Sequence, residues 1–379
     1  MSESELIRDG EQTWDVVVVG GGTAGLSGAL NLARVRRLVL VIDKGEPRNA
    51  PAAGAHGVLG REGISPLELL RLGREEVASY GGRVISGQVA RISRDGAGFR
   101  VVIEGGQRVR ARRVLVTTGL VDVLPDVPGL AERWGRDVLH CVYCHGWEVR
   151  DKVIGVLGNF HQALLFRQMS KDVTLFLHTG MELADEQWEQ LAALGVGMVD
   201  GEITGLEVDG QDQLAGVRLA SGRLVPVQQL VVAPRFLARA RFLGELGVTM
   251  QEHPMGLGEQ LRVDASGFTG VQGVWAAGNV SDVLAGVPAA AAAGTTAAAA
   301  IHMDLRRVLV AVNLNPISRC ITLSRSASSR SADSMSVGRS SRDSSTTGLQ
   351  SRRSSNSLSC PGTIKCSETG RRAVSGAAS

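Results

Sequence analysis

The sequence contains few aromatic residues, few cysteines and no long uninterrupted hydrophobic run. Phe, Trp and Tyr make up only 4% of the 379 residues. The five cysteines include only one closely spaced pair before residue 313, which excludes the disulfide framework of a small secreted protein. The longest apolar stretch, residues 285–301, is broken by Gly, Pro and Thr, and the acidic N-terminus lacks the basic start and apolar core of a signal peptide. We therefore expect a soluble, cytoplasmic protein that does not interact with a membrane.

Positive charge is concentrated at the C-terminal end of the chain. From residue 316 onward there are ten Lys or Arg and three Asp or Glu, whereas the net charge of the whole chain is +3. The rest of the chain is slightly acidic and gives no reason to expect nucleic-acid binding. Twenty of the last 64 residues are serine, and almost no periodic apolar pattern survives there. This composition predicts a disordered tail over residues 313–379.

Glycine, by contrast, is abundant, with 48 residues. Buried-strand patterns at residues 15–20 and 38–42 flank a helical pattern at 26–34, which together indicate a βαβ unit. A second unit repeats this plan, with strands expected at 153–157 and 172–178 around a helix at 162–170. A further strand at 273–278 leads into an Ala-rich helix at about 287–302. The sequence therefore predicts an α/β protein with parallel sheets.

The first βαβ unit carries a glycine fingerprint for a dinucleotide. Gly20, Gly22 and Gly25, with Thr23 and Ala24 between them, follow the first strand, and Asp43 closes the second strand. In this pattern the first glycine permits a tight turn, and the second lets the backbone approach a pyrophosphate. The third glycine allows close packing of the helix on the strand. The carboxylate of Asp43 can accept hydrogen bonds from ribose hydroxyls. A glycine turn without a ligand is the alternative. The fingerprint does not distinguish FAD from NAD.

A second motif indicates thiol chemistry. Cys141 and Cys144 form a Cys-x-x-Cys pair flanked by His140 and His145. Two thiols at this spacing can close into a disulfide, and a neighbouring imidazolium favours the nucleophilic thiolate. A zinc site would need a second, distant ligand pair, which the sequence does not offer, so we expect no metal. Two inert buried thiols remain an alternative, and His140 could equally be a packing residue.

Four segments occur in an order that resembles the thioredoxin reductase-like FAD-dependent pyridine nucleotide-disulfide oxidoreductases. They are DVVVVGGGTAGLSGAL, VTTGLVDVLPDVPGL, CVYC and GVWAAGNVSD, within residues 14–305. The resemblance implies two Rossmann-like, doubly wound domains and a homodimer. Residues 1–121 and 242–312 would form a discontinuous FAD domain, residues 122–241 an inserted smaller NAD(P)H-like domain that carries the cysteine pair, and residues 313–379 the tail.

The resemblance also assigns roles in flavin binding and thiol exchange to individual residues. Thr118 and Gly119 correspond to the family's Thr-Gly turn near the flavin, and Val89 corresponds to a residue whose backbone meets the adenine. Gly278 and Asn279 correspond to a Gly-Asp pair near the ribityl-phosphate region, with Asn in place of the usual Asp. By the same resemblance, Cys144 would be the thiol nearer the flavin, and Cys141 the exposed thiol that exchanges with substrate.

Two departures from bacterial thioredoxin reductases bear on the direction of electron flow. His145 follows the second cysteine where those enzymes have Asp, and CVYCHGWE resembles the Cys-x-x-Cys-His-Gly variant of dithiol oxidases in this superfamily. In the second unit, Phe160 replaces the middle glycine between Gly158 and Ala163, and we expect its Cβ and ring to block a pyrophosphate. The connection from strand to helix also looks several residues shorter than that of the family. No arginine for a 2′-phosphate follows His178. The sequence thus argues against NADPH, with atypical binding as the alternative.

These observations predict an FAD-dependent dithiol/disulfide oxidoreductase. Cys141, Cys144 and His145 would be catalytic, and an imidazole with a pKa of about 6.5 could move protons near neutral pH. The expected direction is dithiol oxidation, and the expected substrate is a small dithiol or a thioredoxin-like protein. An NADPH-dependent thioredoxin-disulfide reductase is the first alternative. An inactive flavin-binding scaffold is the second.

Overall fold

The computed structural model describes residues 12–306 of the chain. The expected disordered tail at 313–379 and the acidic N-terminal residues lie outside this range. None of the helices in the described range is long and apolar enough to cross a membrane.

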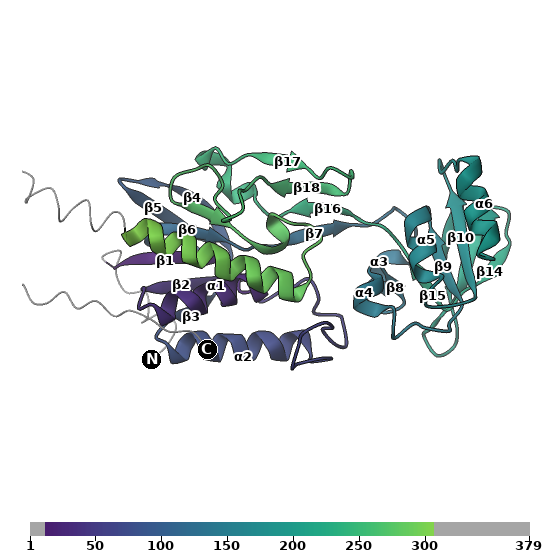
Figure 1. Ribbon diagram of the computed structural model, residues 1–379, viewed down its shortest axis with the longest axis horizontal. Coiled ribbons are helices and arrows are strands. Elements are labelled where there is room, and N and C mark those ends of the chain that lie inside the picture. The colour runs from purple at the N-terminus through teal and green to yellow at the C-terminus, as the bar shows by residue number, and fades with distance from the viewer. Residues whose placement is uncertain (1–11, 307–379) are drawn as a thin grey trace, which may run out of the picture. The chain divides into compact units, whose positions relative to one another are not determined.

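A seven-stranded sheet forms around the N-terminal βαβ unit (Figure 1). Its order is β3-β2-β1-β6-β5-β4, with β19 paired to β6. Strands β1, β2, β3, β6 and β19 pair in parallel, whereas β4, β5 and β6 are antiparallel neighbours. The strands are β1 (Thr13–Val19), β2 (Val39–Asp43), β3 (Arg83–Ser86), β4 (Val89–Asp95), β5 (Gly98–Ile103), β6 (Arg108–Val116) and β19 (Val274–Ala276).

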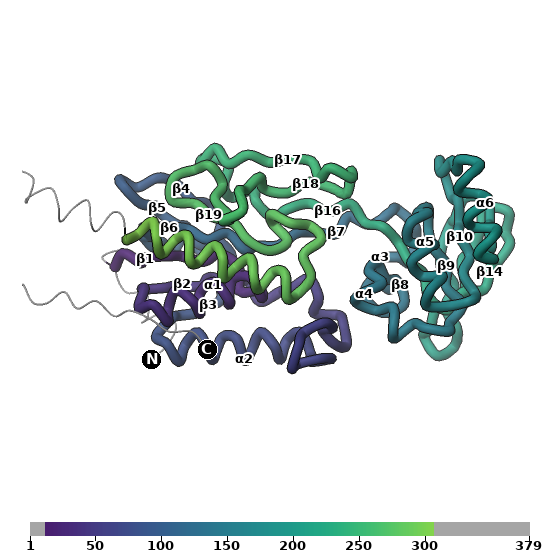
Figure 2. The backbone as a smooth tube through the Cα atoms, viewed as in Figure 1, coloured from purple at the N-terminus to yellow at the C-terminus, as the bar shows by residue number. Residues whose placement is uncertain are grey.

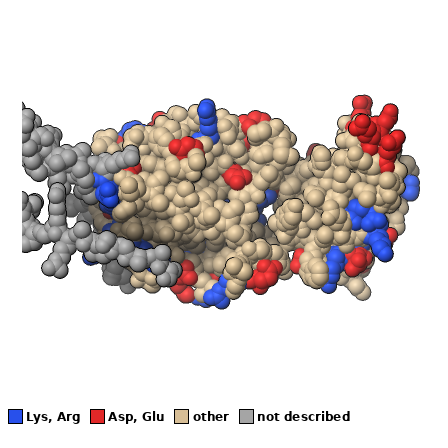
Figure 3. Space-filling model, viewed as in Figure 1, with Lys and Arg blue, Asp and Glu red and all other residues tan. Residues whose placement is uncertain are grey.

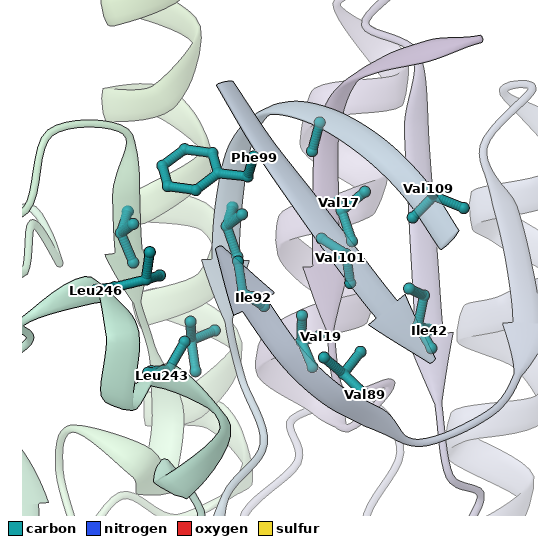
Figure 4. Close-up of a cluster of buried hydrophobic side chains, with 14 of the residues drawn as sticks. Val17, Val19, Ile42, Val89, Ile92, Phe99, Val101, Val109, Leu243 and Leu246 are labelled. Carbon is teal, nitrogen blue, oxygen red and sulfur yellow. The ribbon is translucent and has the colours of Figure 1, made fainter. Parts of the chain in front are cut away.

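Apolar clusters fill two cores around this sheet. One core contains the alternate side chains of β1 together with α1 (Thr23–Arg34), α2 (Pro66–Ser79) and a helix over 287–306. The helix over 287–306 lies against α1 at Gly294, where an added Cβ would stand 2.0 Å from the Ala24 carbonyl oxygen. The other core brings Leu243 and Leu246 of the 3-10 helix η1 (Arg241–Leu246) onto the antiparallel part of the sheet (Figure 4).

The middle of the chain forms a second parallel sheet. Its order is β11-β10-β9-β15-β8, and the neighbouring strands pair in parallel. A small antiparallel sheet of β12, β13 and β14 follows it. The strands are β8 (Val138–Leu139), β9 (Ile154–Leu157), β10 (Val173–His178), β11 (Gly197–Asp200), β12 (Ile203–Val208), β13 (Leu214–Leu219), β14 (Leu224–Pro226) and β15 (Gln229–Val231), and the helices are α3 (Leu130–Arg133), α4 (Val142–His145), α5 (Phe160–Phe166) and α6 (Asp185–Ala193).

Two strands connect this second sheet to the rest of the chain. The entering strand β7 (Leu120–Val123) pairs antiparallel with the returning strand β16 (Arg235–Ala238), as Figure 2 shows. β16 continues into a four-stranded sheet with β17 (Met250–Glu252) and β18 (Gly258–Leu261). The two Rossmann-like sheets confirm the predicted fold class. The predicted boundaries after residues 121 and 241 fall inside β7 and η1, and they stay predictions.

Charge is dispersed on the face of the molecule drawn in Figure 3. Lys and Arg side chains are scattered over this face, and acidic side chains gather over α6, whose first turn contains Asp185 and Glu186. Acidic residues in the first turn of a helix are favourable because the N-terminal end of the helix dipole is positive.

Candidate functional site

The two closely spaced cysteines lie on a tight turn that follows β8. Cys141 is the N-cap residue of α4, and its carbonyl accepts hydrogen bonds from the backbone N–H groups of Cys144 (3.3 Å) and His145 (3.1 Å). Gly146 ends this turn, and an added Cβ there would stand 2.4 Å from the Val142 carbonyl oxygen. The one-turn helix therefore brings the two thiols to the same side of the backbone.

The two thiols differ strongly in acidity. Their Sγ atoms are 2.6 Å apart, and the Cys144 thiol donates to Cys141. This hydrogen bond, helped by the backbone N–H groups of Cys144 and Tyr143, lowers the pKa of Cys141 to about 6, although burial acts in the opposite direction. The same interaction raises the pKa of Cys144. In the reduced pair, Cys141 is therefore the thiolate near neutral pH.

The resemblance implied that Cys141 is the more exposed of the two cysteines, and the structure shows the opposite. Cys144 is exposed and Cys141 is half-buried. Cys141 lies between β8 and α4, whereas Cys144 is the third residue of the one-turn helix α4. Cys141 is thus the more acidic and the less exposed of the two thiols, and its role as the exchanging thiol stays a prediction.

His145 ends α4 directly after Cys144. Its Nδ1 is buried and has no hydrogen-bond partner within residues 12–306. Burial lowers the pKa of His145, Glu148 raises it and His56 lowers it. Glu148 also approaches His56, with 3.5 Å between Oε1 and Nε2. Since the net effect is a lowered pKa, His145 is neutral at pH 7 and can accept a proton.

A cavity of about 500 Å³ opens beside α4. This volume lies in the range of small-molecule sites. Tyr143 and Trp147 on its wall are 85% and 69% exposed, and the Arg150 guanidinium stacks on Trp147 at 4.1 Å. Two carboxylates, Glu62 and Glu148, also line it. The apolar lining consists of Val142, Tyr143, Trp147, Leu165 and Met169.

The glycine loop between β1 and α1 has the backbone that its sequence predicts. Gly20 has φ +102°, and an added Cβ there would stand 2.5 Å from the Thr117 carbonyl oxygen. At Gly25 an added Cβ would lie 2.0 Å from the Gly20 carbonyl oxygen. At Gly22, the N-cap of α1, it would meet no described atom within 4 Å. The N-terminus of α1 is therefore open to a ligand that approaches over Gly22.

Asp43 and Thr117 hold this loop in place. Asp43 Oδ1 accepts from the Gly21 backbone N–H at 2.9 Å, and its Oδ2 lies 3.0 Å from Arg74 Nη2. The Thr117 hydroxyl lies within hydrogen-bond distance of the carbonyls of Val19 (3.0 Å) and Gly20 (2.8 Å). Thr117 was not predicted from the sequence. It directly follows β6, next to β1, where the register pairs Val19 with Val116.

The other residues assigned to the flavin lie around the same sheet. Val89 begins β4 and is buried. The Thr118 hydroxyl donates to the Arg239 carbonyl at 2.6 Å, and Gly119, with φ +69°, accepts from the Arg239 N–H at 3.0 Å. These contacts link the end of β6 to the segment after β16.

The structure explains why Asn279 stands where the family has Asp after Gly278. The side-chain amide nitrogen of Asn279 donates to the carbonyls of Asp282 (3.1 Å), Val283 (3.4 Å) and Ala285 (2.9 Å). A carboxylate cannot donate, so Asp could not hold this loop in the same way. Gly278 has φ +75°, and an added Cβ would stand 2.8 Å from the Ala24 Cβ. The pair therefore lies beside the first turn of α1.

The second βαβ unit corrects the expectation for Phe160. Phe160 is the first residue of α5, and its side chain is buried in the core of the second sheet. The loop itself is one residue shorter than the first, because α5 begins directly after Gly158 and Asn159. Asn159 is the N-cap, and its Oδ1 accepts from the Gln162 N–H at 3.0 Å. The protein's own side chain thus occupies a donor at the helix N-terminus.

No group of three or more His, Cys, Asp or Glu in the described part of the chain could hold a metal ion.

Comparisons with known proteins agree with this geometry. The family model for pyridine nucleotide-disulphide oxidoreductases matches residues 14–294. The thioredoxin reductase tcpT of Claviceps purpurea is 32% identical over 299 residues, covering 75% of this chain and 91% of that protein. The thioredoxin reductase sirT of Leptosphaeria maculans is 31% identical over 311 residues, covering 77% and 94%. The crystal structure of HlmI aligns with a TM-score of 0.76 and 44% identity, covering 82% and 98%.

The family match spans well over half of the chain. It includes the glycine loop at residues 20–25 and the turn at residues 141–146 that carries the two cysteines, which we call the redox turn. The chain belongs to the pyridine nucleotide-disulphide oxidoreductase family, as a thioredoxin reductase-like enzyme.

Proposed function

We propose that this enzyme is an FAD-dependent dithiol oxidase. Family membership implies FAD, and the open N-terminus of α1 over Gly22 fits a pyrophosphate. Backbone groups from Gly20 to Gly25, including Thr23 and Ala24, would bind the phosphates, and Asp43 the ribose. By resemblance, the remaining contacts would come from Val89, Thr118, Gly119, Gly278 and Asn279.

The reaction that we propose starts from the disulfide form of Cys141 and Cys144. A substrate thiolate attacks the Cys141 sulfur, which breaks the Cys141-Cys144 bond and leaves a thiolate on Cys144. The second substrate thiol then attacks the substrate sulfur of the mixed disulfide and releases Cys141. The backbone N–H groups of Cys144 and Tyr143, which lower the pKa of Cys141, favour Cys141 as the leaving group at this step. The substrate leaves as a disulfide, having lost two electrons and two protons.

His145 would take up one of these protons beside Cys144, because its lowered pKa keeps the imidazole neutral. FAD supplies the two-electron acceptor for the reduced cysteine pair, and an external acceptor such as molecular oxygen finally receives the electrons. In this scheme the chain's own residues exchange thiols, hold thiolates and move protons.

One observation carries the direction of electron flow. The second βαβ unit has a loop one residue shorter than the first, and Asn159 caps α5 where a nucleotide pyrophosphate would need free N–H groups. An enzyme with this loop is poorly suited to NADPH. A dithiol substrate supplies electrons without a second nucleotide.

Oxygen consumption tests the proposal. We expect a dithiol such as dithiothreitol to reduce the bound flavin under anaerobic conditions and to drive oxygen uptake in air. We expect Cys144→Ser to lose at least a thousandfold in this rate, since the disulfide cannot form. Rapid NADPH-driven disulfide reduction by the wild-type enzyme would overturn the oxidase direction.

The second candidate is an NADPH-dependent thioredoxin reductase, and it is favoured by the names of the curated relatives tcpT and sirT. It uses the same cysteines with electrons flowing in the opposite direction. Stopped-flow bleaching of the flavin by NADPH, followed by reduction of a thioredoxin, separates the two candidates.

We also propose a small-molecule dithiol in preference to a thioredoxin-like protein, because the cavity beside α4 has the size of a small-molecule site. The homodimer and the cytoplasmic location remain predictions. Light scattering of the purified enzyme tests the homodimer.

A further inference from the structure

Gln162 links the first turn of α5 to the redox turn. Its side chain is only 8% exposed. Its Nε2 donates to the His140 carbonyl at 2.8 Å and lies 3.1 Å from His140 Nδ1. Its Oε1 has no partner within residues 12–306, so the amide bonds through its donor side. The residue that Gln162 holds is the one directly before Cys141.

His140 faces both a donor and an acceptor. Its Nδ1 is 3.1 Å from Gln162 Nε2 and 3.1 Å from the Val232 carbonyl oxygen. A neutral imidazole with its proton on Nε2 accepts from Gln162, whereas an imidazole protonated on Nδ1 donates to Val232. Nδ1 therefore has a hydrogen-bond partner in either tautomer. The ring is fixed from a third side by Phe236, at 5.3 Å and 81°.

Two charged groups, Arg48 and Asp122, act on this imidazole. Arg48, in the segment after β2, forms a bidentate pair with Asp122 of β7, at 2.7 Å for both hydrogen bonds, and lies over the Phe236 ring at 5.2 Å. Cys141 follows on the same turn, and its pKa is lowered by Arg48 as well.

The balance at His140 favours the neutral form. Burial is the largest effect and lowers the pKa of His140. The Val232 carbonyl and Asp122 raise it, while Arg48 lowers it. A neutral imidazole accepts from the Gln162 amide in one tautomer and donates to the Val232 carbonyl in the other, while the hydrogen bond from Gln162 to the His140 carbonyl is present with both.

We propose that Gln162 is a positioning residue for the redox pair, and that through the His140 carbonyl and imidazole it holds Cys141 where the N–H groups of α4 stabilise its thiolate. This inference rests on the proposed thiol chemistry and deepens it. The first turn of the second βαβ helix, capped by Asn159, supports thiol exchange where a nucleotide-binding turn would hold phosphate. In this proposal, the first turn of α5 positions the cysteine pair instead of binding a nucleotide phosphate.

The acidity of Cys141 in the reduced flavoprotein tests this proposal. We would reduce the pair with a phosphine and measure carbamidomethylation of Cys141 by iodoacetamide, peptide by peptide, across pH 4–9. The wild-type midpoint is expected at about 6. For Gln162→Leu, the loss of one buried hydrogen bond should raise the midpoint by about 0.5 to 1 pH unit and slow flavin reduction by dithiol about fivefold at pH 7.

A second variant keeps the test decisive if Gln162→Leu fails to fold. Gln162→Glu has the same shape, but its carboxylate cannot donate to the His140 carbonyl, and it favours the imidazolium. We expect it to raise the pKa of His140 by about one unit in ¹⁵N-histidine spectra and to shift the Cys141 midpoint. Gln190→Leu, on the exposed face of α6, is the matched control and should change neither quantity.

Two folded Gln162 variants with the wild-type Cys141 midpoint and an unchanged His140 spectrum would overturn the proposal. Alkylation does not depend on the direction of electron flow. If the wild-type enzyme reduced disulfides with NADPH instead, the oxidase proposal would fall while the Gln162 measurement still gave its own answer.

Discussion

The two βαβ units share a plan but differ at the start of their helices. In β1-α1-β2, three glycines lead into the helix, and a Cβ at the N-cap would project into open space. In β9-α5-β10, the loop is one residue shorter and the N-cap is Asn159, whose side chain bonds to the first turn. The comparison teaches that an N-cap residue decides whether a helix N-terminus is offered to a ligand or consumed by the protein.

The difference extends beyond the loops. The first turn of α1 lies beside Gly278 and Gly294, so its surroundings are made of small residues and backbone. The first turn of α5 instead places Gln162 against His140, which precedes the redox pair. The second unit thus has the β-α-β architecture of the first, while a polar side chain from its first helical turn contacts the residue before the cysteine pair.

Of the substitutions considered, Gly25→Ala should have the largest effect on stability and flavin binding, and it acts on the first βαβ unit. Its Cβ would stand 2.0 Å from the Gly20 carbonyl oxygen, which belongs to the backbone and cannot move aside easily. We expect a loss of about 3 kcal/mol in the free energy of unfolding and no retained flavin band. Urea unfolding and the visible spectrum measure both. Gly210→Ala is the control because its Cβ meets open space. A yellow, fully stable Gly25→Ala protein would contradict the close packing of α1 on β1.

Gly22→Ala should separate ligand binding from folding in the same loop. Its Cβ contacts none of the described atoms, so the melting temperature of the apoprotein should change by less than about 2 °C. Flavin affinity should fall at least tenfold, because the methyl group would occupy the path of the pyrophosphate. Fluorescence titration of the apoprotein with FAD measures this. Unchanged affinity would mean that the cofactor does not approach over Gly22.

Cys144→Ala should raise the pKa of Cys141. In the reduced pair, the Cys144 thiol supplies the largest stabilisation of the Cys141 thiolate. The thiolate of the native pair is present above pH 6 and is lost as the pH falls through about 6, so reactivity with iodoacetamide declines on that acid side. The alanine variant should shift this midpoint upward by at least about one unit. Cys144→Ser retains a hydrogen-bond donor, so its Cys141 midpoint should lie between those of the native protein and the alanine variant. A midpoint that stays near 6 in the alanine variant would assign the acidity to the backbone alone.

Asn159→Ala should have the smallest effect and should be confined to the second unit. Loss of the N-cap hydrogen bond should reduce the free energy of unfolding by about 1 kcal/mol. Flavin content should stay at the wild-type level, since the first loop is untouched. Asn159→Asp, which can still accept from the Gln162 N–H, should restore stability. Loss of flavin in Asn159→Ala would contradict the independence of the two loops.

Regular elements near the N-terminus could be predicted closely from sequence. The first strand was expected at residues 15–20 and is β1 (Thr13–Val19), and the second was expected at 38–42 and is β2 (Val39–Asp43). The helix was expected from residue 26, but α1 begins at Thr23, because Gly22 serves as the N-cap directly after the turn. Strong apolar periodicity fixes the existence of such elements, and capping decides where they begin.

The site could be predicted only in part. The glycine loop and the Cys-x-x-Cys turn depend on residues close in sequence, so spacing alone located them. The shorter connection before α5 was visible in the sequence, but the expectation that the Phe160 ring lies in the path of a ligand was wrong, because Phe160 begins α5 and packs in the core. The contact between Gln162 and His140 joins residues 22 positions apart on different elements, and local pattern carries no signal for it.

Trp147 gives this enzyme an intrinsic optical reporter. It lies three residues beyond Cys144, is 69% exposed and stacks under the Arg150 guanidinium, whereas Trp14 and Trp275 are buried in the core. A molecule that settles over the cysteine pair would change the environment of this indole more than that of the buried two. The arrival and departure of substrate could therefore be followed by emission from the native chain, with no dye attached.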